Sequence, residues 1–196
     1  MKQTNLTNLQ KIVSTNQRKI NAENEMTTNE KTTPKPKIAL SRRAKAEWTG
    51  DLLHGRGRLT VGSGALDVPY SVRSRFEDGQ SATNPEELLG AAHAGCFTMA
   101  LAAQLSGAGF TPNELDTVAK VSFEKIGENF QITRIELETS ADVPGVDETT
   151  FRALAADAKK NCPVSKALAA TEIKLKATLR NADKTRTPTE VAVGKD

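Results

Sequence analysis

The stretch NPEELLGAAHAGCFTMALAAQL, residues 84–105, is almost free of polar side chains and decides the fold around it. Asn84 is a natural helix N-cap, Pro85 fits the first helical turn, and two glutamates follow where the helix dipole favours negative charge. The apolar residues beyond them cover the whole circumference of the helix: Leu88, Leu89, Ala91, Ala92, Ala94, Phe97, Met99, Ala100, Leu101 and Leu105. Such a helix must be buried on every side.

Burial on every side requires more cover than one copy of the chain supplies. A sheet covers only one side of a helix, and a core of about 140 residues with two principal helices is too small to enclose one of them. A second copy of the chain is the simplest source of cover, so we expect a homodimer with this helix at its centre. The alternative is a monomer in which the second helix and the loops complete the cover.

The composition is that of one well-packed domain with tails, since 37% of the 196 residues are hydrophobic and 26% are charged. His93 and Gln104 interrupt the apolar stretch, which is rich in alanine and glycine, so we expect no membrane span. The basic start is not followed by a compact apolar segment with a cleavage site, so we expect no secretory signal and a cytoplasmic protein. The alternative is an organelle-targeting helix on four apolar residues at helical spacing: Leu6, Leu9, Ile12 and Val13.

The net charge of +3 does not point to a nucleic-acid partner once it is divided along the chain. Residues 1–37 hold seven basic and three acidic residues, residues 181–196 hold three of each, and residues 38–180 hold 17 basic against 18 acidic. The central part has no basic stripe interleaved with aromatic residues. We therefore expect no binding of nucleic acid.

The chain divides into three parts by composition. Residues 1–37 are dominated by Asn, Thr, Lys, Gln and Glu and end in TTPKPK, which predicts a disordered polar extension. Residues 38–180 form the predicted domain, and residues 181–196 a flexible tail. Six short segments of alternating character predict strands: Ala44–Trp48, Gly57–Val61, Leu66–Val72, Val118–Phe123, Phe130–Glu138 with a phase slip near Arg134, and Ile173–Leu179.

A second helix is predicted after Asp147, which can serve as its N-cap. One stripe of this helix is apolar: Phe151, Leu154, Ala155, Ala158 and Cys162. Pro163 ends the helix or bends it sharply. Strands before and after two helices that cover a sheet make the fold class α+β.

The two cysteines, Cys96 and Cys162, lie in the two predicted helices. A buried cysteine is usually an inert small hydrophobe. Three features favour chemistry instead: alanine or valine would pack as well, Gly95 and Pro163 interrupt the backbone beside the sulfurs, and charged residues lie nearby. If Gly90 and Gly95 break the first helix, Cys96 begins a new helix whose dipole lowers the pKa of its thiol.

A thiolate in an apolar pocket also needs a buried cation. The segment VRSRFEDG supplies Arg73 and Arg75 just before the helix. Either Glu86 or Glu87 can hold a guanidinium in place by a bidentate pair. The alternative for all these charges is a solvated loop.

Three segments, RFEDGQSATNPEELLGAAHAGCFTMAL, DVPGVDETTF and KKNCPVSKAL, resemble the OsmC (osmotically inducible protein C) family of organic hydroperoxide reductases. The resemblance covers roughly residues 42–179, with AEWTGDLLHGRG near its start. It implies an OsmC-like intertwined homodimer, with antiparallel sheets packed on two central helices and active sites at the subunit interface. One departure is Gly95, at a position where alanine is common in the family.

The resemblance also implies which residues carry the chemistry. Cys96 is then the peroxidatic cysteine, Cys162 the resolving cysteine, Arg75 the arginine of the RFE motif, and Glu86 the active-site glutamate. A Cys96 thiolate would attack an organic hydroperoxide, favoured over hydrogen peroxide by the apolar surroundings, and the resulting sulfenic acid would form a disulfide with Cys162. An external dithiol, lipoyl-type or thioredoxin-like, would reduce that disulfide in oxidative and osmotic stress defence. No metal or organic cofactor is required.

Three other functions compete with this interpretation. A metal site could use His54, His93, Cys96 and Cys162, but the paired short spacings of zinc motifs are missing. A cysteine hydrolase could pair Cys96 with His93, yet a histidine on an apolar helix is more typical of a structural or interface role, and Cys162 would have no task. A non-catalytic, stress-associated binding protein of the same fold is the main alternative.

Overall fold

The computed structural model of the chain describes residues 40–77 and 79–180. The predicted extension over 1–37 and the predicted tail over 181–196 lie outside the described residues. The described elements are, in chain order, β1 (Ala44–Thr49), β2 (Arg56–Val61), β3 (Asp67–Tyr70), α2 (Val72–Phe76), α3 (Pro85–Gly107), β4 (Glu114–Ile126), β5 (Asn129–Asp142), α4 (Glu148–Asn161), α5 (Pro163–Ala167) and β6 (Glu172–Leu179). The mixture of sheets and helices confirms the predicted α+β class.

The first sheet is a three-stranded antiparallel meander in the order β1-β2-β3, and its strands overlap the first three predicted segments. Trp48 and Tyr70 pack against each other across it, with their ring centroids 5.5 Å apart. Gly57 lies directly opposite Tyr70, and a Cβ atom there would come within 2.1 Å of the tyrosine ring. The glycine is therefore required by the close approach of an aromatic side chain.

The second sheet has the order β4-β5-β6, and its β4–β5 hairpin is antiparallel. The register shifts between Ser122, which faces Arg134, and Phe123, which faces Ile132, so that Thr133 is accommodated in a bulge. This confirms the phase slip predicted near Arg134. The strand β6 runs parallel to β5, so the expectation of antiparallel sheets alone is wrong for this strand. The reason is that α4 and α5 form a crossover connection, which returns the chain to the same end of the sheet.

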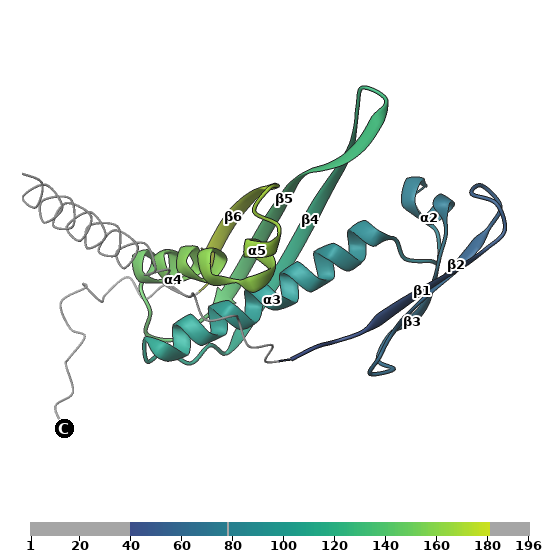
Figure 1. Ribbon diagram of the computed structural model, residues 1–196. Helices are drawn as coiled ribbons and strands as arrows, with labels where there is room; N and C mark the ends of the chain where they lie inside the picture. Colours follow the sequence, from purple (N-terminus) through teal and green to yellow (C-terminus); the bar gives the residue numbers. More distant parts are fainter. Residues whose placement is uncertain (1–39, 78, 181–196) are drawn as a thin grey trace, which may run out of the picture. The chain divides into compact units, whose positions relative to one another are not determined.

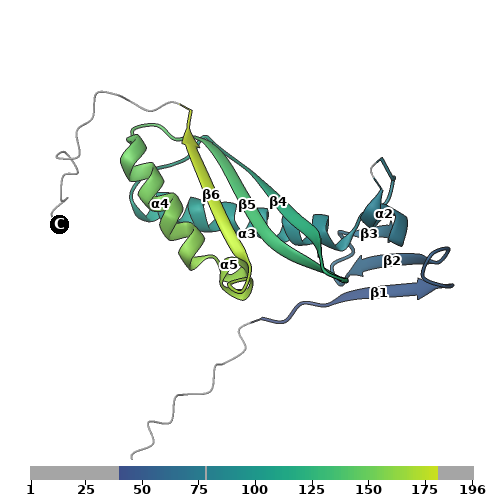
Figure 2. The same ribbon diagram turned by 90° about the horizontal axis from the view of Figure 1, so that it is seen from above.

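The two long helices cover one face of the second sheet (Figures 1 and 2). The helix α3 packs on β4, α4 packs on β6, and the two helices pack against each other. The core between these layers is apolar: Phe97, Leu101, Leu105, Leu137, Ala141, Val143, Val146, Phe151, Ala155, Ala158, Cys162 and Leu179. Gly90 lets α3 approach the sheet, since a Cβ atom there would lie 3.2 Å from the carbonyl oxygen of Ala119.

The helix α3 begins as predicted and continues without a break. The side chain of Asn84 accepts a hydrogen bond from the backbone N–H of Glu87, and Pro85 occupies the first turn. The helix then runs through Gly95 to Gly107, so Cys96 does not begin a new helix, and that expectation is wrong. An internal glycine costs a helix only about 1 kcal/mol, which the packing of its neighbours easily offsets.

One face of α3 has no cover within this chain. His93, Phe97 and Leu101 on the inner face are fully buried, whereas Ala91, Ala92, Gly95 and Met99 are exposed. By length and mean hydropathy (1.4), α3 is the one helix of the described part that is apolar enough to cross a membrane, a property that core helices of soluble proteins share. The described residues of a single chain therefore do not complete the burial that the sequence of α3 demands.

Candidate active site

The two cysteines lie side by side, although 66 positions separate them in the chain. Cys96 stands on α3, and Cys162 stands at the junction where α4 ends and α5 begins. The backbone N–H of Cys162 still donates to the carbonyl of Ala158, but Pro163 cannot continue the pattern, so the chain turns at this point. The Sγ atoms are 3.2 Å apart, and both thiols are free.

The two sulfurs differ in their access to solvent. The side chain of Cys162 is fully buried in the core, whereas Cys96 is only half-buried. A reagent that approaches from outside therefore meets Cys96 first. After Cys96 is oxidised, the sulfur of Cys162 is within reach and protected from the same reagent.

The surroundings of the two thiols shift their pKa values in opposite directions. Burial raises the pKa of the Cys96 thiol by more than the hydrogen bond from the backbone N–H of Val164 lowers it. Burial acts on Cys162 too, but hydrogen bonds from Ser165, Cys96 and Val164 outweigh it, so the pKa of Cys162 is lowered. Within one chain, Cys162 is thus the better thiolate, and Cys96 still lacks the cation that a reactive thiolate needs.

The cation predicted for this task, Arg75, is held by Glu86. Arg75 Nε lies 3.1 Å from both carboxylate oxygens, and its Nη2 lies 2.6 Å from Oε1, in a bidentate pair. The Glu86 side chain is 11% exposed and that of Arg75 37%. Of the two candidate glutamates, Glu86 is therefore the partner; Glu87 instead accepts a hydrogen bond from the Thr83 hydroxyl.

The short helix α2, which the sequence did not predict, positions Arg75. Ser71 and Ser74 form a reciprocal capping box at its start. The Ser74 hydroxyl donates to the carbonyl of Thr83, and the Asn84 side chain donates to the carbonyl of Ser74, so α2 is tied to the start of α3. The other arginine of the segment, Arg73, pairs with Glu77 on the exposed side.

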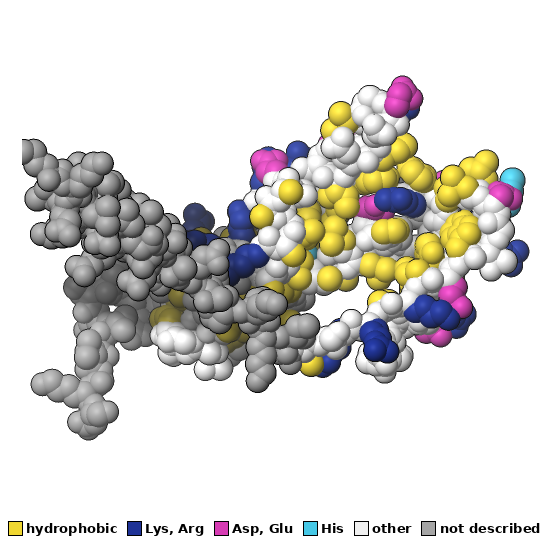
Figure 3. All heavy atoms as spheres, in the orientation of Figure 1, with side chains coloured by type: hydrophobic (Ala, Val, Ile, Leu, Met, Phe, Trp, Pro, Cys, Tyr) yellow, Lys and Arg dark blue, Asp and Glu magenta, His cyan; other side chains and the backbone are white. Residues whose placement is uncertain are grey.

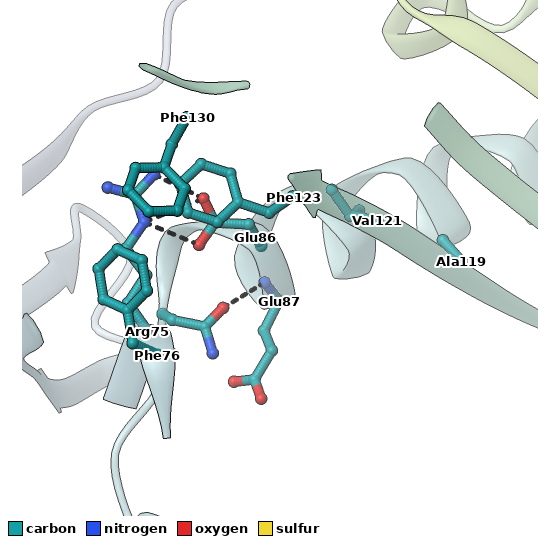
Figure 4. Close-up of a pocket in the computed structure, with 9 residues that line it drawn as sticks. Arg75, Phe76, Glu86, Glu87, Ala119, Val121, Phe123 and Phe130 are labelled. Atoms are coloured by element: carbon teal, nitrogen blue, oxygen red, sulfur yellow. Dashed lines mark hydrogen bonds and ion pairs between the residues drawn. The ribbon is translucent and has the colours of Figure 1, made fainter. Parts of the chain in front are cut away.

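Three aromatic rings lie around the arginine (Figure 4). The Arg75 guanidinium lies 4.4 Å from the centroid of the Phe123 ring, in a cation–π contact. Phe123 stacks on Phe130, and Phe76 meets both rings with centroids 5.9 and 5.2 Å away. These side chains, with Val121 and Ala119 of β4, line a pocket of about 470 Å³ that contains a cation and an ion-paired carboxylate.

The structure brings the predicted site residues together as two separate pairs. Cys96 and Cys162 form one, and Arg75 and Glu86 form the other. Cys96 lies ten residues after Glu86 on the continuous helix α3, which corresponds to about 15 Å along the helix axis. One chain by itself therefore does not place Arg75 beside Cys96.

Two features of the site escaped the sequence reasoning. Ser165 contacts His93, with its Oγ 2.8 Å from Nε2, and the only sequence signal for it is its place three residues after Cys162 in CPVS. The three phenylalanines come from α2, β4 and β5, so no local pattern joins them. Of the histidines, His54 lies against Asp51 at the surface, and residues 40–77 and 79–180 contain no group of three or more His, Cys, Asp or Glu placed to hold a metal.

Comparisons with known proteins give a consistent picture. The family model described as OsmC-like protein matches residues 77–178, about half of the chain. The chain is 46% identical over 134 residues to Peroxiredoxin OsmC of Escherichia coli K12. This alignment covers 68% of this chain and 93% of the E. coli protein. The fold is similar to the organic hydroperoxide resistance protein OhrB of Bacillus subtilis (26% identity, TM-score 0.53, 70% of this chain and 98% of that one). It is also similar to an organic hydroperoxide resistance protein of Elizabethkingia anophelis (26% identity, TM-score 0.56, 74% and 99%).

Proposed function

The chain belongs to the OsmC family, and from this premise we propose that it is a cysteine-based peroxidase that reduces organic hydroperoxides to alcohols. The observation that carries the proposal is the pair of sulfurs 3.2 Å apart, one half-buried and the other fully buried. This arrangement suits a cysteine that meets the oxidant and a second cysteine that resolves the product. We therefore assign Cys96 the peroxidatic role and Cys162 the resolving role.

The first half-reaction forms a sulfur–oxygen bond. The Cys96 thiolate attacks the distal oxygen of the hydroperoxide, the O–O bond breaks, and the alkoxide leaves and takes up a proton to become the alcohol. Cys96 is oxidised to a sulfenic acid, and the peroxide is reduced. A guanidinium beside the reacting atoms favours the thiolate and stabilises the charge that develops on the departing oxygen.

The second half-reaction returns the enzyme to its starting state. The Cys162 sulfur attacks the Cys96 sulfenic acid, a disulfide forms, and water leaves. An external dithiol, lipoyl-type or thioredoxin-like, then reduces the disulfide. The cycle needs no metal or organic cofactor, and a cytoplasmic location suits it because free thiols persist in a reducing compartment.

A homodimer would bring the two residue pairs together. If two copies of α3 pack antiparallel about a two-fold axis near Ala91, the midpoint between Glu86 and Cys96, then Arg75 and Glu86 of one subunit lie beside Cys96 of the partner subunit. The exposed face of α3 supports this arrangement, since Ala91, Ala92 and Gly95 are small enough for a close helix contact. The second copy would also supply the cover that α3 lacks.

The pocket around Arg75 supports organic hydroperoxides as the substrate class. Three phenylalanine rings, with Ala119 and Val121, form the apolar part of its lining, and Figure 3 shows hydrophobic side chains gathered on this face of the molecule. Phe76 and Phe130 remain 52% and 49% exposed, so apolar surface is available for an alkyl or fatty-acyl chain. Hydrogen peroxide would gain nothing from that surface. Faster turnover with hydrogen peroxide than with an alkyl hydroperoxide would contradict this preference.

Mass spectrometry after brief treatment with an organic hydroperoxide tests the proposed function. The enzyme should form a Cys96–Cys162 disulfide rapidly, and the Cys162→Ser variant should accumulate Cys96 as an overoxidised acid. A non-catalytic binding protein of the same fold would instead show slow oxidation without preference for Cys96. That second result would overturn the proposal.

Complementation between two inactive variants tests the shared site. Co-expressed Arg75→Ala and Cys96→Ser chains would form mixed dimers, each with one complete site and one site that lacks both residues. With random pairing, half of the dimers are mixed, so about a quarter of wild-type activity should return. If each site lies within a single chain, no activity returns.

A further inference from the structure

A buried histidine and a buried serine lie next to the cysteine pair. His93 is completely buried, Ser165 is 7% exposed, and His93 Nε2 is 2.8 Å from Ser165 Oγ. His93 precedes Cys96 by three residues on α3, and Ser165 follows Cys162 by three residues at α5. Residues three apart lie on the same side of α3, and Ser165 is the third residue of α5, whose N-cap is Cys162, so the polar pair lies beside the sulfur pair.

The surroundings of the His93 ring determine which residue of the His93–Ser165 pair donates the hydrogen bond. His93 Nδ1 is buried and has no hydrogen-bond partner among the described residues. If Nδ1 carried the proton, a buried N–H donor would be left unpaired, which is rarer in proteins than an unpaired acceptor. The proton therefore belongs on Nε2, so His93 donates and the Ser165 oxygen accepts.

This assignment frees the single hydroxyl proton of Ser165 for another acceptor. The acceptor at hand is the Cys162 sulfur. Burial acts to raise the pKa of that thiol, but hydrogen bonds from the backbone N–H and the hydroxyl of Ser165, together with Cys96 and Val164, outweigh it and lower the pKa. The interaction of Ser165 with Cys162 thus joins the His93–Ser165 contact to the Cys162–Cys96 contact.

We propose that His93 and Ser165 are positioning residues for the resolving half-reaction: His93 holds the Ser165 hydroxyl as a donor to Cys162, the sulfur that attacks the Cys96 sulfenic acid. This inference rests on the proposed function. In the step itself, the Cys162 sulfur attacks Cys96 Sγ, the S–S bond forms and the S–O bond breaks. The leaving hydroxide takes the thiol proton and departs as water, so His93 and Ser165 exchange no net proton.

A purely structural role does not account for the imidazole. A leucine would fill a fully buried position on α3 without leaving Nδ1 unpaired in the core. The polar side chain is useful only through the contact that it makes, and that contact is with Ser165. The direction of the effect also suits the reaction, because the Cys162 thiolate is the nucleophile that attacks the oxidised Cys96.

A thiol titration that needs no peroxide tests the hydrogen-bond chain directly. In a Cys96→Ser background, Cys162 is the only thiol, and the ultraviolet absorbance of its thiolate can be followed against pH. Ser165→Ala and His93→Leu should each raise the pKa of Cys162 by about one unit, a roughly tenfold smaller thiolate fraction below the pKa. His93→Gln, whose amide can still donate to Ser165, should stay near the background value.

Stopped-flow kinetics then separates the two half-reactions. With both cysteines present, Ser165→Ala and His93→Leu should slow disulfide formation about tenfold at neutral pH and move its pH profile toward alkaline pH. Trapping of the sulfenic acid should show that its formation remains within about twofold of wild type, since the contact of Ser165 is with Cys162. His93→Gln should restore the wild-type profile.

The possible failures are distinguishable. If wild-type protein forms no Cys96–Cys162 disulfide with a hydroperoxide, the proposed function fails, while the titration still reports on His93 and Ser165. If wild type forms it and Ser165→Ala matches wild type in both rate and Cys162 pKa, the inference is wrong. Ser165→Ala is the deciding variant, because it removes only one hydroxyl group and leaves the His93 side chain in the core.

Discussion

The Gly95→Leu substitution distinguishes a monomeric from a dimeric protein, because it should stabilise a monomer and destabilise a dimer. In one chain, Gly95 lies on the exposed face of α3, and apart from its two chain neighbours and the nearby backbone of the helix itself no heavy atom lies within 4 Å of the position of an added Cβ. A leucine there would contact solvent only. In the proposed dimer the same position lies near the two-fold axis, where the partner helix approaches.

The magnitudes follow from these two environments. For a monomer, replacing an internal helical glycine with leucine should stabilise the fold by about 0.5–1 kcal/mol, through the higher helix propensity of leucine. For a dimer, the leucine overpacks a close helix contact in both subunits, and each insertion should cost about 1–3 kcal/mol or more. The total exceeds the gain in propensity, so the dimer should weaken or dissociate.

Size-exclusion chromatography with light scattering and urea unfolding at two protein concentrations measure both effects. We expect Gly95→Leu to shift the protein toward monomer, lower its unfolding midpoint and reduce peroxidase activity with it. Gly107→Leu is the matched control, since Gly107 is in the last turn of the same helix with equally open space around it. A Gly95→Leu protein that is more stable than wild type and fully active would refute the dimer argument.

Three further substitutions test the charged and titrating groups. Glu86→Gln should lower activity by about 100-fold, because the half-exposed Arg75 would lose the partner that orients it, and enzyme assays measure this loss. The lost ion pair should also lower the free energy of unfolding by roughly 1–2 kcal/mol, which urea unfolding measures. In Arg75→Gln, no guanidinium would offset the burial and the Cys162 interaction that raise the pKa of Cys96. Initial rates should therefore be at least about tenfold below wild type at neutral pH and should climb as pH rises. Burial lowers the pKa of His93, so the unfolded state binds the proton more readily than the folded state. The stability of the wild-type protein should therefore fall as pH drops below about 6.5, by up to about 1.4 kcal/mol per pH unit. Urea unfolding between pH 7 and 5 should show a smaller loss for His93→Gln, and equal losses would contradict the argument.

Local chemistry made most of the fold predictable. Asn84 and Pro85 mark the start of α3, and Asp147 caps α4 through hydrogen bonds from both the backbone N–H and the hydroxyl of Thr150. The slip near Arg134 is visible because the alternation of apolar residues changes phase there. Each of these signals acts within a few residues, which is why a single sequence reveals it.

The features that were missed depend on contacts between distant residues. The helix α2 is stabilised by Ser74, which caps it in place of the usual glutamate and also binds Thr83 from another segment. The parallel direction of β6 follows from the crossover, and the choice of Glu86 over Glu87 follows from the rotation of α3 on the sheet. Ser165 joins the site through a tertiary contact with His93, which no spacing rule encodes.

The position of Cys162 in the crossover between β5 and β6 has a consequence for the oxidised protein. A bond from this point to α3 would close a covalent ring across 66 positions of the chain, from the middle of the first long helix to the end of the second. By loop-closure entropy, such a ring should stabilise the fold by about 4 kcal/mol. The melting temperature would then report the oxidation state, so a thermal-shift instrument could follow catalytic turnover and score candidate reductants without any chromogenic substrate.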